Sequence, residues 1–313
     1  MPPKILVISG PTASGKTRLA VELALRHGGE VVSADSMQVY RRMDIGTAKP
    51  TPEEMRGIPH HMLDVADPEE DFSVARYVEL AAPCVDDILA RGKLPIVAGG
   101  TGLYLDSLLS GRTFAPFSPD GGLRARLEAR FDALGGEAML GELAAADPEA
   151  AARLHPNDRK RIVRALEVFQ QTGKTISQHN RETRALPLRY DALTLSLAFQ
   201  RREDMWARID HRVDEMMERG LAQEVRSLLD SGVPEKCTAM QAIGYKEMAA
   251  ALRGDGDVDR AAREIQLRSR QYAKRQLTWF RRNGAAKWIT WDSEPNFAQA
   301  LQVSTGYLED FGI

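Results

Sequence analysis

Short apolar runs alternate with longer amphipathic stretches along much of the chain. The runs of strand length are residues 4–9, 29–34, 94–100, 193–199 and 286–291. Residues 18–28 and 73–92, which separate the first three runs, repeat their apolar positions with a helical period. This alternation predicts an α/β fold with a parallel sheet and crossover helices.

The alternation stops where proline and glycine cluster, at residues 113–122. From there to residue 188 the apolar positions keep a helical period, and no run of strand type interrupts them. Because a strand signal returns at residue 193, we predict a helical insertion at 116–192 within an α/β domain formed by 1–115 and 193–313. At 313 residues the chain exceeds what one hydrophobic core usually organises, which agrees with this division.

The composition, with 43% apolar and 27% charged residues, is typical of a soluble globular protein. No apolar window approaches the roughly 18 residues of a membrane span, and the run at residues 5–8 is too short for a signal peptide. Two cysteines support neither a disulfide framework nor a zinc module. We expect a cytoplasmic protein with no membrane partner, acting as a monomer.

The near-neutral formal charge of −2 conceals two basic segments. Residues 159–184 hold seven Arg or Lys against two Glu, and residues 260–287 hold nine against one, while residues 53–87 are acidic. Such segments fit a polyanion, and they fit the solvated surface of ordinary helices equally well. In the second segment, a helical stripe of aromatic residues that includes Trp279 is flanked on both sides by Arg and Lys. The aromatic side chains suit packing in a core, and the flanking cations suit contacts with the phosphates of a nucleic acid.

The clearest motif is GPTASGKT, which follows an apolar run and precedes a helical one. It matches G-x-x-x-x-G-K-[ST] in full, and such a loop binds phosphates with backbone N–H groups and a helix N-terminus. Its residues are Gly10, Pro11, Thr12, Ala13, Ser14, Gly15, Lys16 and Thr17. In this motif the lysine reaches a terminal phosphate and the threonine hydroxyl ligates Mg²⁺. The motif predicts a P-loop NTPase-like core, for which a kinase or ATPase is the default function.

Polar residues follow two further strand-like runs. Asp35 directly follows the second run. It would act either as a metal ligand through water or as a base that faces the substrate. Thr101 lies in the glycine-rich turn after the third run, which is either a simple turn or part of the same site. Because the carboxyl ends of parallel strands meet at one edge of the sheet, we expect both residues near Lys16.

Two arginines, Arg208 and Arg212, are four residues apart and therefore share one face of a predicted helix. Ile209, Val213 and Met216 are predicted to form an apolar stripe on the opposite face. An arginine beside a phosphate site neutralises a leaving group, whereas an exposed arginine is commonly just solvated.

Several segments resemble, in order and spacing, those of the tRNA dimethylallyltransferases, also called tRNA isopentenyltransferases. They are GPTASGKT, SADSMQVYRRMDIGTAKP, PHHMLDV, VAGGTGLYL, RIVRALEV, AMQAIGYKE and SRQYAKRQLTWFR, and they extend from Gly10 to Arg281. The second and the last are rarely seen outside this family, whereas the phosphate loop alone is unspecific. With only two cysteines, the zinc finger of eukaryotic relatives is not expected, which points to the bacterial form.

The resemblance implies transfer of a dimethylallyl group from dimethylallyl diphosphate to N6 of the adenosine 3′-adjacent to the anticodon, in tRNAs that read U-initial codons. It also implies that the phosphate loop binds the diphosphate of the donor, with Mg²⁺ at Thr17, and that diphosphate is released. Asp35 would act as the base, and Thr101 would hydrogen-bond near the reacting centre. Lys16 and Arg212 would stabilise the leaving group.

The resemblance further implies contacts with the anticodon stem-loop of tRNA. The matching residues are Asp35, Ser36, Met37, Gln38, Thr101, Leu123, Arg159, Lys160, Arg161, Ile162, Val163, Arg164, Met240, Gln241, Ala242, Ile243, Gly244, Tyr245, Ala273, Lys274, Arg275, Gln276, Leu277, Thr278, Trp279 and Phe280. The insertion would then serve tRNA binding, and the target adenine would be flipped into the cleft.

Three other functions stay open from the sequence. An adenylate prenyltransferase would share the donor site, but a free nucleotide needs neither the insertion nor the basic segments. A kinase or ATPase needs a residue that orients the nucleophile, and the sequence does not identify one. An RNA-binding module with a nucleotide switch would bind tRNA without transferring a group to it.

Overall fold

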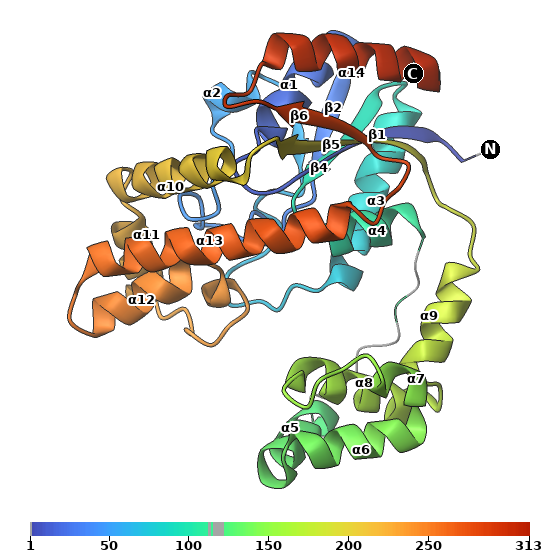
Figure 1. Cartoon of the computed structure of the whole chain (residues 1–313), viewed down its shortest axis with the longest axis vertical. Coiled ribbons are helices and arrows are strands. Elements are labelled where there is room, and N and C mark those ends of the chain that lie inside the picture. Colours follow the sequence, from blue (N-terminus) through green and yellow to red (C-terminus); the bar gives the residue numbers. More distant parts are fainter. Residues whose placement is uncertain (1, 112–113, 115–121) are drawn as a thin grey trace. The chain divides into compact units, whose positions relative to one another are not determined.

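The computed structural model describes residues 2–111, 114 and 122–313. They form two compact units, one made of Met1–Leu109 with Arg189–Ile313 and the other of Ser110–Leu188 (Figure 1). The predicted start of the insertion, Pro116, lies outside the described residues. Its predicted end, residue 192, falls inside a strand of the first unit that begins at Asp191, where Asp191 pairs with Lys4. The helical segment therefore ends before that strand.

Within the described residues, the first unit contains a six-stranded sheet in the order β3-β2-β4-β1-β5-β6, and every pairing is parallel. The strands are β1 Lys4–Ser9, β2 Gly29–Ser33, β3 His60–His61, β4 Leu94–Gly99, β5 Asp191–Phe199 and β6 Lys287–Trp291. All but β3 fall on the predicted apolar runs, which confirms the α/β fold. β3 escapes the prediction because its two residues are polar and its strand character comes only from pairing with Val31 and Val32.

Helices cover both faces of the sheet (Figure 1). They are α1 Lys16–His27, α2 Pro52–Met55, α3 Val74–Ala90, α4 Gly102–Leu109, α10 Arg202–Glu218, α11 Leu221–Asp230, α12 Tyr245–Arg253, α13 Val258–Phe280 and α14 Phe297–Phe311, with a 3-10 turn η1 Ala239–Gln241. In β1, Ile5 and Val7 pack in a core completed by α3, α4 and α11 to α13. Leu6 and Ile8 pack in a second core completed by α1 and α14. Burial on both faces explains why the strands are continuous apolar runs.

Three loops leave the sheet at the same edge. Ser9, the last residue of β1, pairs with Gly99 of β4 and Ser196 of β5. Ser33, the last residue of β2, pairs with Ala98 of β4. The phosphate loop, the segment that carries Asp35 and the glycine-rich turn therefore start beside one another, where ligands bind in sheets of this kind.

The second unit is helical. Its helices are α5 Gly122–Leu134, α6 Gly136–Ala146, α7 Pro148–Ala151, α8 Arg159–Thr172 and α9 Ile176–Arg184. They enclose a core of their own, in which Leu127, Leu143 and Leu166 are almost fully buried. Among the helices of both units that the structure describes, none combines the length and apolarity needed to cross a membrane.

At the start of β2, far along the strand from the edge where the three loops begin, Glu30 is a buried carboxylate in a basic setting. Arg91 donates two hydrogen bonds to it, of 2.5 and 2.8 Å, and Lys93 donates one of 2.7 Å. His61 Nε2 lies 2.8 Å away. The bonds from Arg91 are the main reason that the pKa of Glu30 is held well below its usual range.

Replacing Glu30 with glutamine should lower the free energy of unfolding at pH 7 by about 3 kcal/mol, because two cations lose their buried partner. The depressed pKa makes this contribution complete above about pH 4.5, the ordinary value of the group, and lost as the pH falls toward the folded-state pKa. Urea unfolding of parent and variant at several pH values measures the difference. Glu22→Gln, which removes an exposed pair with Arg56, is the control and should cost less than about 1 kcal/mol. Equal losses would contradict the role of Glu30.

Candidate active site

The phosphate loop joins β1 to α1 and is packed too closely to accept side chains at its outer glycines. Gly15 has a φ of 85°, and a Cβ there would lie 2.7 Å from the ring of Phe297. A Cβ at Gly10 would lie 2.9 Å from the carbonyl oxygen of Leu197. Helix α1 begins directly after Gly15, so its first N–H groups face the loop. The loop therefore has the strand, turn and helix that phosphate binding requires.

Lys16 lies against the loop and forms no ion pair with any carboxylate of the residues that the structure describes. Its Nζ donates a hydrogen bond of 2.6 Å to the carbonyl oxygen of Pro11. Burial, and after it the positive charge of Arg212, lower the pKa of Lys16 to about 7, against an opposing effect of Asp35. A bound phosphate would favour the charged form, so the lysine is placed for an anionic ligand.

Two arginines of α10 extend the positive charge around the loop. Arg208 Nε lies 3.4 Å from the carbonyl oxygen of Ala13, and Arg212 Nη1 lies 3.4 Å from Thr12 Oγ1. Burial lowers the pKa of Arg212. Neither guanidinium forms an ion pair with a carboxylate of the residues that the structure describes. Cations left unpaired beside a phosphate loop fit a multiply charged anion.

The loop cations and Asp35 line one cavity system. A cavity of about 90 Å³ is bounded by Thr12, Lys16, Thr17, Asp35, Gln38, Thr47, Ala98, Gly99, Arg212, Tyr272 and Gln276. A neighbouring cavity of about 310 Å³ shares Thr12, Asp35, Thr47, Arg212 and Tyr272 with it. Asp35 therefore lies near Lys16, as predicted, although the two residues follow different strands of the sheet.

One carboxylate oxygen of Asp35 accepts hydrogen bonds from the backbone of the turn that follows. Oδ1 accepts a hydrogen bond of 2.9 Å from the N–H of Met37 and a longer one of 3.4 Å from that of Gln38. These bonds fix the turn after β2. No hydrogen bond to Oδ2 is found among the described residues, so this oxygen is left for a ligand.

The larger cavity is apolar on the side formed by α10. Ile209, Val213 and Met216 line it together with Arg212. The prediction that these apolar residues face away from the arginine is therefore wrong. Consecutive residues of a helix are about 100° apart around its axis. A cavity that partly surrounds α10 can therefore be lined both by Arg212 and by the neighbouring apolar residues.

Thr101 supports the wall of the site. Its Oγ1 accepts a hydrogen bond of 3.0 Å from the N–H of Ser36 and lies 3.3 Å from Ser36 Oγ. Burial raises the pKa of Tyr272 to about 12, against a hydrogen bond from Thr101 that lowers it. Thr101 thus connects the turn after β4 to the segment that follows Asp35 and to α13.

Gln276 connects α13 to two loops of the site, and nothing in the sequence indicates these contacts. Its Oε1 accepts a hydrogen bond of 2.9 Å from the N–H of Thr12, and its Nε2 donates one of 2.9 Å to the carbonyl oxygen of Gly100. The side chain is buried. Although it stands among the residues predicted to contact tRNA, in this structure it joins α13 to two loops of the sheet edge.

The other predicted tRNA contacts of the first unit divide into buried and accessible side chains. The buried ones are Met240, Ala242, Tyr245, Ala273 and Phe280. Gln241, Ala242 and Ile243 line the larger cavity, as does Arg275. Lys274, Arg275 and Thr278 are exposed on α13, while Leu277 and Trp279 are half-buried. Only the accessible side chains are free to meet a macromolecule directly.

The predicted contacts of the second unit divide in the same way. Ile162 and Val163 are buried in its core, and Leu123 packs against that core. Arg159 pairs with Asp132 at 2.9 Å and Arg164 with Glu167 at 2.7 Å. Lys160 and Arg161 are exposed and form no ion pair with the described residues. These two side chains are the most accessible cations at the start of α8.

The residues around Lys16 also fit a phosphate-bound metal ion. Thr17 and Asp35 line the smaller cavity together, which places a hydroxyl and a carboxylate near the loop. No group of three or more His, Cys, Asp or Glu suited to a metal occurs among the described residues. A metal here would therefore depend on oxygens of the ligand and of water, as Mg²⁺ commonly does.

The chain matches the family model described as IPP transferase over residues 38–283 and the one described as isopentenyl transferase over residues 3–70. It belongs to the IPP transferase family. A tRNA dimethylallyltransferase of Acetivibrio thermocellus is 46% identical over 309 residues, which cover 99% of this chain and 98% of the relative. One of Geobacter sulfurreducens is 48% identical over 309 residues, which cover 99% of this chain and 97% of that one.

Solved structures of the family have the same fold. A full-length tRNA isopentenylpyrophosphate transferase of Bacillus halodurans matches with a TM-score of 0.72 and 41% identity, over 98% of this chain and 97% of that chain. A eukaryotic dimethylallyltransferase acting on tRNA matches with a TM-score of 0.83 and 31% identity, over 98% of this chain and 80% of that chain. The likeness extends over both units of the chain, and the family resemblance seen in the motifs is confirmed.

Proposed function

We propose that this protein is a tRNA dimethylallyltransferase. It transfers a dimethylallyl group from dimethylallyl diphosphate to N6 of the adenosine 3′-adjacent to the anticodon, in tRNAs that read U-initial codons, and releases diphosphate. The observation that carries the proposal is the shared lining of the cavities, which unites the cations of the phosphate loop with the carboxylate of Asp35. Family membership supports the same activity.

The donor fits the cavities by charge and polarity. Its diphosphate would lie at the loop, where Lys16, Arg208 and Arg212 supply positive charge. Its five-carbon chain would lie against the apolar side of the larger cavity, formed by Ile209 and Val213 among others.

In the reaction, the bond from N6 to C1 of the allyl group forms as the bond from C1 to the diphosphate oxygen breaks. The electron pair of that bond leaves with the diphosphate, and N6 gives up one proton. The exocyclic amine of adenine is a weak nucleophile, so a carboxylate that accepts its proton assists the attack. We assign this role to Oδ2 of Asp35, because Oδ1 is bonded to the N–H of Met37, and we assign to Lys16 and Arg212 the stabilisation of the negative charge on the leaving group.

We include Mg²⁺ in this proposal, held by the Thr17 hydroxyl and oxygens of the diphosphate. When bound, the ion adds positive charge to the leaving group. The chain's own residues orient the diphosphate through the loop N–H groups and hold the prenyl carbon toward Asp35.

The adenine must leave the base stack of the anticodon loop to reach Asp35, at a cost of a few kcal/mol. Contacts to the flanking phosphates offset this cost. On the first unit we assign them to exposed cations of α13, Lys274 and Arg275, and on the helical insertion to Lys160 and Arg161. Because a single chain holds every group in the reaction, we propose that it acts as a monomer in the cytoplasm.

Incubation with dimethylallyl diphosphate, Mg²⁺ and unmodified tRNA tests the proposal. Mass spectrometry of the nucleosides should show N6-dimethylallyladenosine in the tRNA. Prenylation of AMP without prenylation of tRNA would assign the protein to free nucleotides. Catalytic release of phosphate from ATP would assign it to the phosphotransfer enzymes, and binding of tRNA without either product would leave an RNA-binding module.

Replacing Arg275 with glutamine should weaken tRNA binding several-fold and reduce the salt slope of binding by about one, since one phosphate contact releases about one counterion. Arg275 is exposed, its guanidinium lies 5.6 Å from the Tyr272 ring centre, and it forms no ion pair with the described residues. Fluorescence anisotropy over a range of salt concentrations measures both effects. The control is Arg268→Gln on the same side of α13, since Arg268 pairs with Glu264 at 2.6 Å. Equal salt slopes in the parent and the Arg275 variant would remove Arg275 from the RNA contacts.

A further inference from the structure

The segment from Asp35 to Lys49 forms one wall of the active-site cavities but has almost no regular secondary structure. Asp35, Gln38 and Thr47 line the smaller cavity from it. A wall of this kind depends on side-chain contacts to hold its shape, because its backbone pairing is limited to a short stretch around one bridge between Tyr40 and Ala66. Its geometry matters for chemistry, since catalytic groups act only within narrow limits of position.

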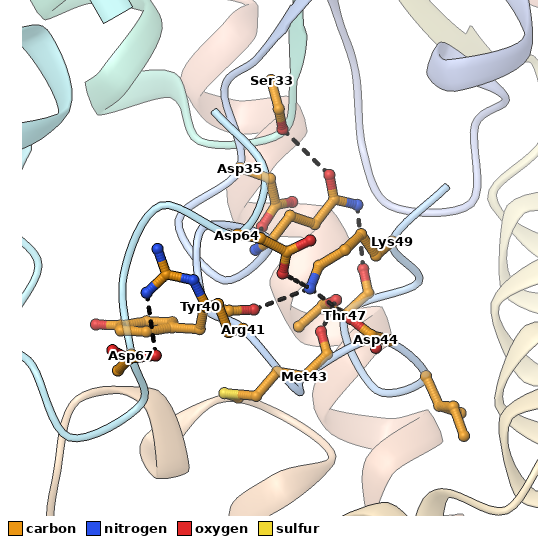
Figure 2. Close-up of polar contacts among 12 residues, drawn as sticks. Ser33, Asp35, Tyr40, Arg41, Met43, Asp44, Thr47, Lys49, Asp64 and Asp67 are labelled. Atoms are coloured by element: carbon orange, nitrogen blue, oxygen red, sulfur yellow. Dashed lines mark hydrogen bonds and ion pairs between the residues drawn. The ribbon is translucent and has the colours of Figure 1, made fainter. Parts of the chain in front are cut away.

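Lys49 provides one set of such contacts (Figure 2). Its Nζ donates hydrogen bonds of 2.9 Å to the carbonyl oxygen of Tyr40, 2.5 Å to Asp44 Oδ1 and 2.6 Å to Asp64 Oδ1. An ammonium group has three protons, so each has an acceptor and none is left for a ligand. The Lys49 side chain is only 6% exposed, whereas its two aspartate partners are about half exposed. Two carboxylates and a carbonyl compensate the burial of one positive charge.

The acceptors lie on two strips of chain that pair with each other. The N–H of Asp64 bonds to the carbonyl oxygen of Gln38 at 3.3 Å, and the N–H of Val65 bonds to that of Val39 at 2.8 Å. Lys49 therefore connects the end of the segment to both strips of this pairing. Its positive charge also offsets the electrostatic repulsion between the carboxylates of Asp44 and Asp64.

Gln38 connects the residues next to Lys49 to the wall of the cavity. Its Oε1 accepts a hydrogen bond of 3.1 Å from Ser33 Oγ, and its Nε2 donates bonds of 3.2 and 3.1 Å to the carbonyl oxygens of Thr47 and Ala48. Thr47 and Ala48 directly precede Lys49 and line the larger cavity. Movement of Lys49 would therefore move the backbone atoms that hold Gln38.

Glu224 of α11 holds the same segment from another side. Its carboxylate accepts bonds of 2.9, 2.8 and 3.1 Å from the N–H groups of Asp44, Ile45 and Gly46, and one of 2.5 Å from Tyr245 Oη. This contact keeps the segment attached to the core when Lys49 is changed. The loss of Lys49 should thus loosen the cavity wall without unfolding the unit.

We propose that Lys49 is a positioning residue of the transferase. It does not line the cavities; instead it fixes Gln38 and Thr47 relative to Asp35, so that the adenine and the prenyl carbon meet the base at the correct distance. This inference rests on the proposed function. A merely structural lysine would change stability without changing how the folded enzyme turns over its substrates.

The test compares Lys49→Met with Arg41→Met. Arg41 is on the same segment, but its guanidinium pairs with Asp67 at the surface, 3.0 Å away (Figure 2). At a temperature where circular dichroism shows both variants folded, kcat for tRNA prenylation should fall about 10- to 100-fold in Lys49→Met, as a displaced catalytic group would cause. The KM for dimethylallyl diphosphate should change less than about threefold, because the phosphate loop is untouched. Arg41→Met should resemble the parent in both constants.

Two further variants test the same role of Lys49, including the case in which Lys49→Met does not fold. Lys49→Arg retains the charge and should recover part of kcat. Asp64→Asn removes one of the two negative charges that face the Lys49 ammonium group while Lys49 stays, and it should lower kcat even if Lys49→Met does not fold. A kcat within twofold of the parent in a folded Lys49→Met, or in Asp64→Asn where Lys49→Met does not fold, would overturn the proposal. So would a rise in KM for dimethylallyl diphosphate that accounts for the whole loss.

Hydrogen exchange distinguishes failure of this inference from failure of the proposed function. In Lys49→Met, amides of residues 36–48 should exchange faster than in the parent, while amides of α1 should not. If the parent transfers no prenyl group to tRNA, the proposed function fails, yet the exchange result still reports whether Lys49 holds the wall. If the parent is active and the exchange of residues 36–48 is unchanged, the positioning role alone is wrong.

Discussion

Asp35→Asn should lower kcat for prenyl transfer to tRNA about 1000-fold, within the range that general-base catalysis usually contributes. Asparagine keeps an oxygen that accepts the hydrogen bond from the N–H of Met37, so the turn after β2 stays intact. What the variant loses is the carboxylate that accepts the proton of N6. Single-turnover kinetics with saturating tRNA and dimethylallyl diphosphate isolates the chemical step from product release.

Binding measurements separate this loss from a loss of affinity. The dissociation constants of tRNA and dimethylallyl diphosphate should stay within a few-fold of the parent, because the phosphate loop and the basic side chains of α13 are unchanged. Asp67→Asn is the matched control, since Asp67 is an exposed carboxylate paired with Arg41 at the surface. If Asp35→Asn retained more than a fifth of the parental rate, another group would have to accept the proton.

The parts of the site that the sequence predicts correctly are those with local signals. The phosphate loop is a contiguous motif between a strand and a helix, and the position of Asp35 follows from the rule that parallel strands end at one edge. Lys16 and Asp35 line one cavity because Ser9 and Ser33 end β1 and β2, the two strands that flank β4, at the same edge of the sheet. For such residues, the hydrophobic periodicity and the topology of the sheet are sufficient to predict their position in the site.

Other features depend on contacts between distant segments and have no local signal. Gln276 bonds the phosphate loop across 264 sequence positions, and nothing in its helix distinguishes it from an exposed glutamine. Lys49 looks like an ordinary surface lysine, yet its acceptors on residues 40, 44 and 64 bury it. The apolar stripe of α10 is visible in the sequence, but the cavity that it shares with Arg212 appears only when other elements surround the helix.

Lys16→Met should weaken binding of dimethylallyl diphosphate about 100-fold, as expected when a partly buried charge that meets a diphosphate is removed. Isothermal titration calorimetry with Mg²⁺ present measures the affinity. Arg18→Met is the control, because Arg18 is the next cation along α1 but its guanidinium lies over the ring of Phe297, 4.2 Å from its centre. Unchanged affinity in Lys16→Met would show that the loop does not bind the donor through this lysine.

The pH dependence of the same binding reaction identifies the group. The pKa of Lys16 in the unliganded protein is lowered to about 7, and a bound diphosphate raises it by favouring the ammonium form. Below about pH 7 the lysine is already charged, so its contribution to affinity is constant; above pH 7 the affinity falls, because binding must take up a proton. Titrations at pH 8 in two buffers of different ionisation enthalpy should therefore detect nearly one proton more bound by the parent than by Lys16→Met. Equal proton uptake would mean that Lys16 does not change its protonation state when the diphosphate binds.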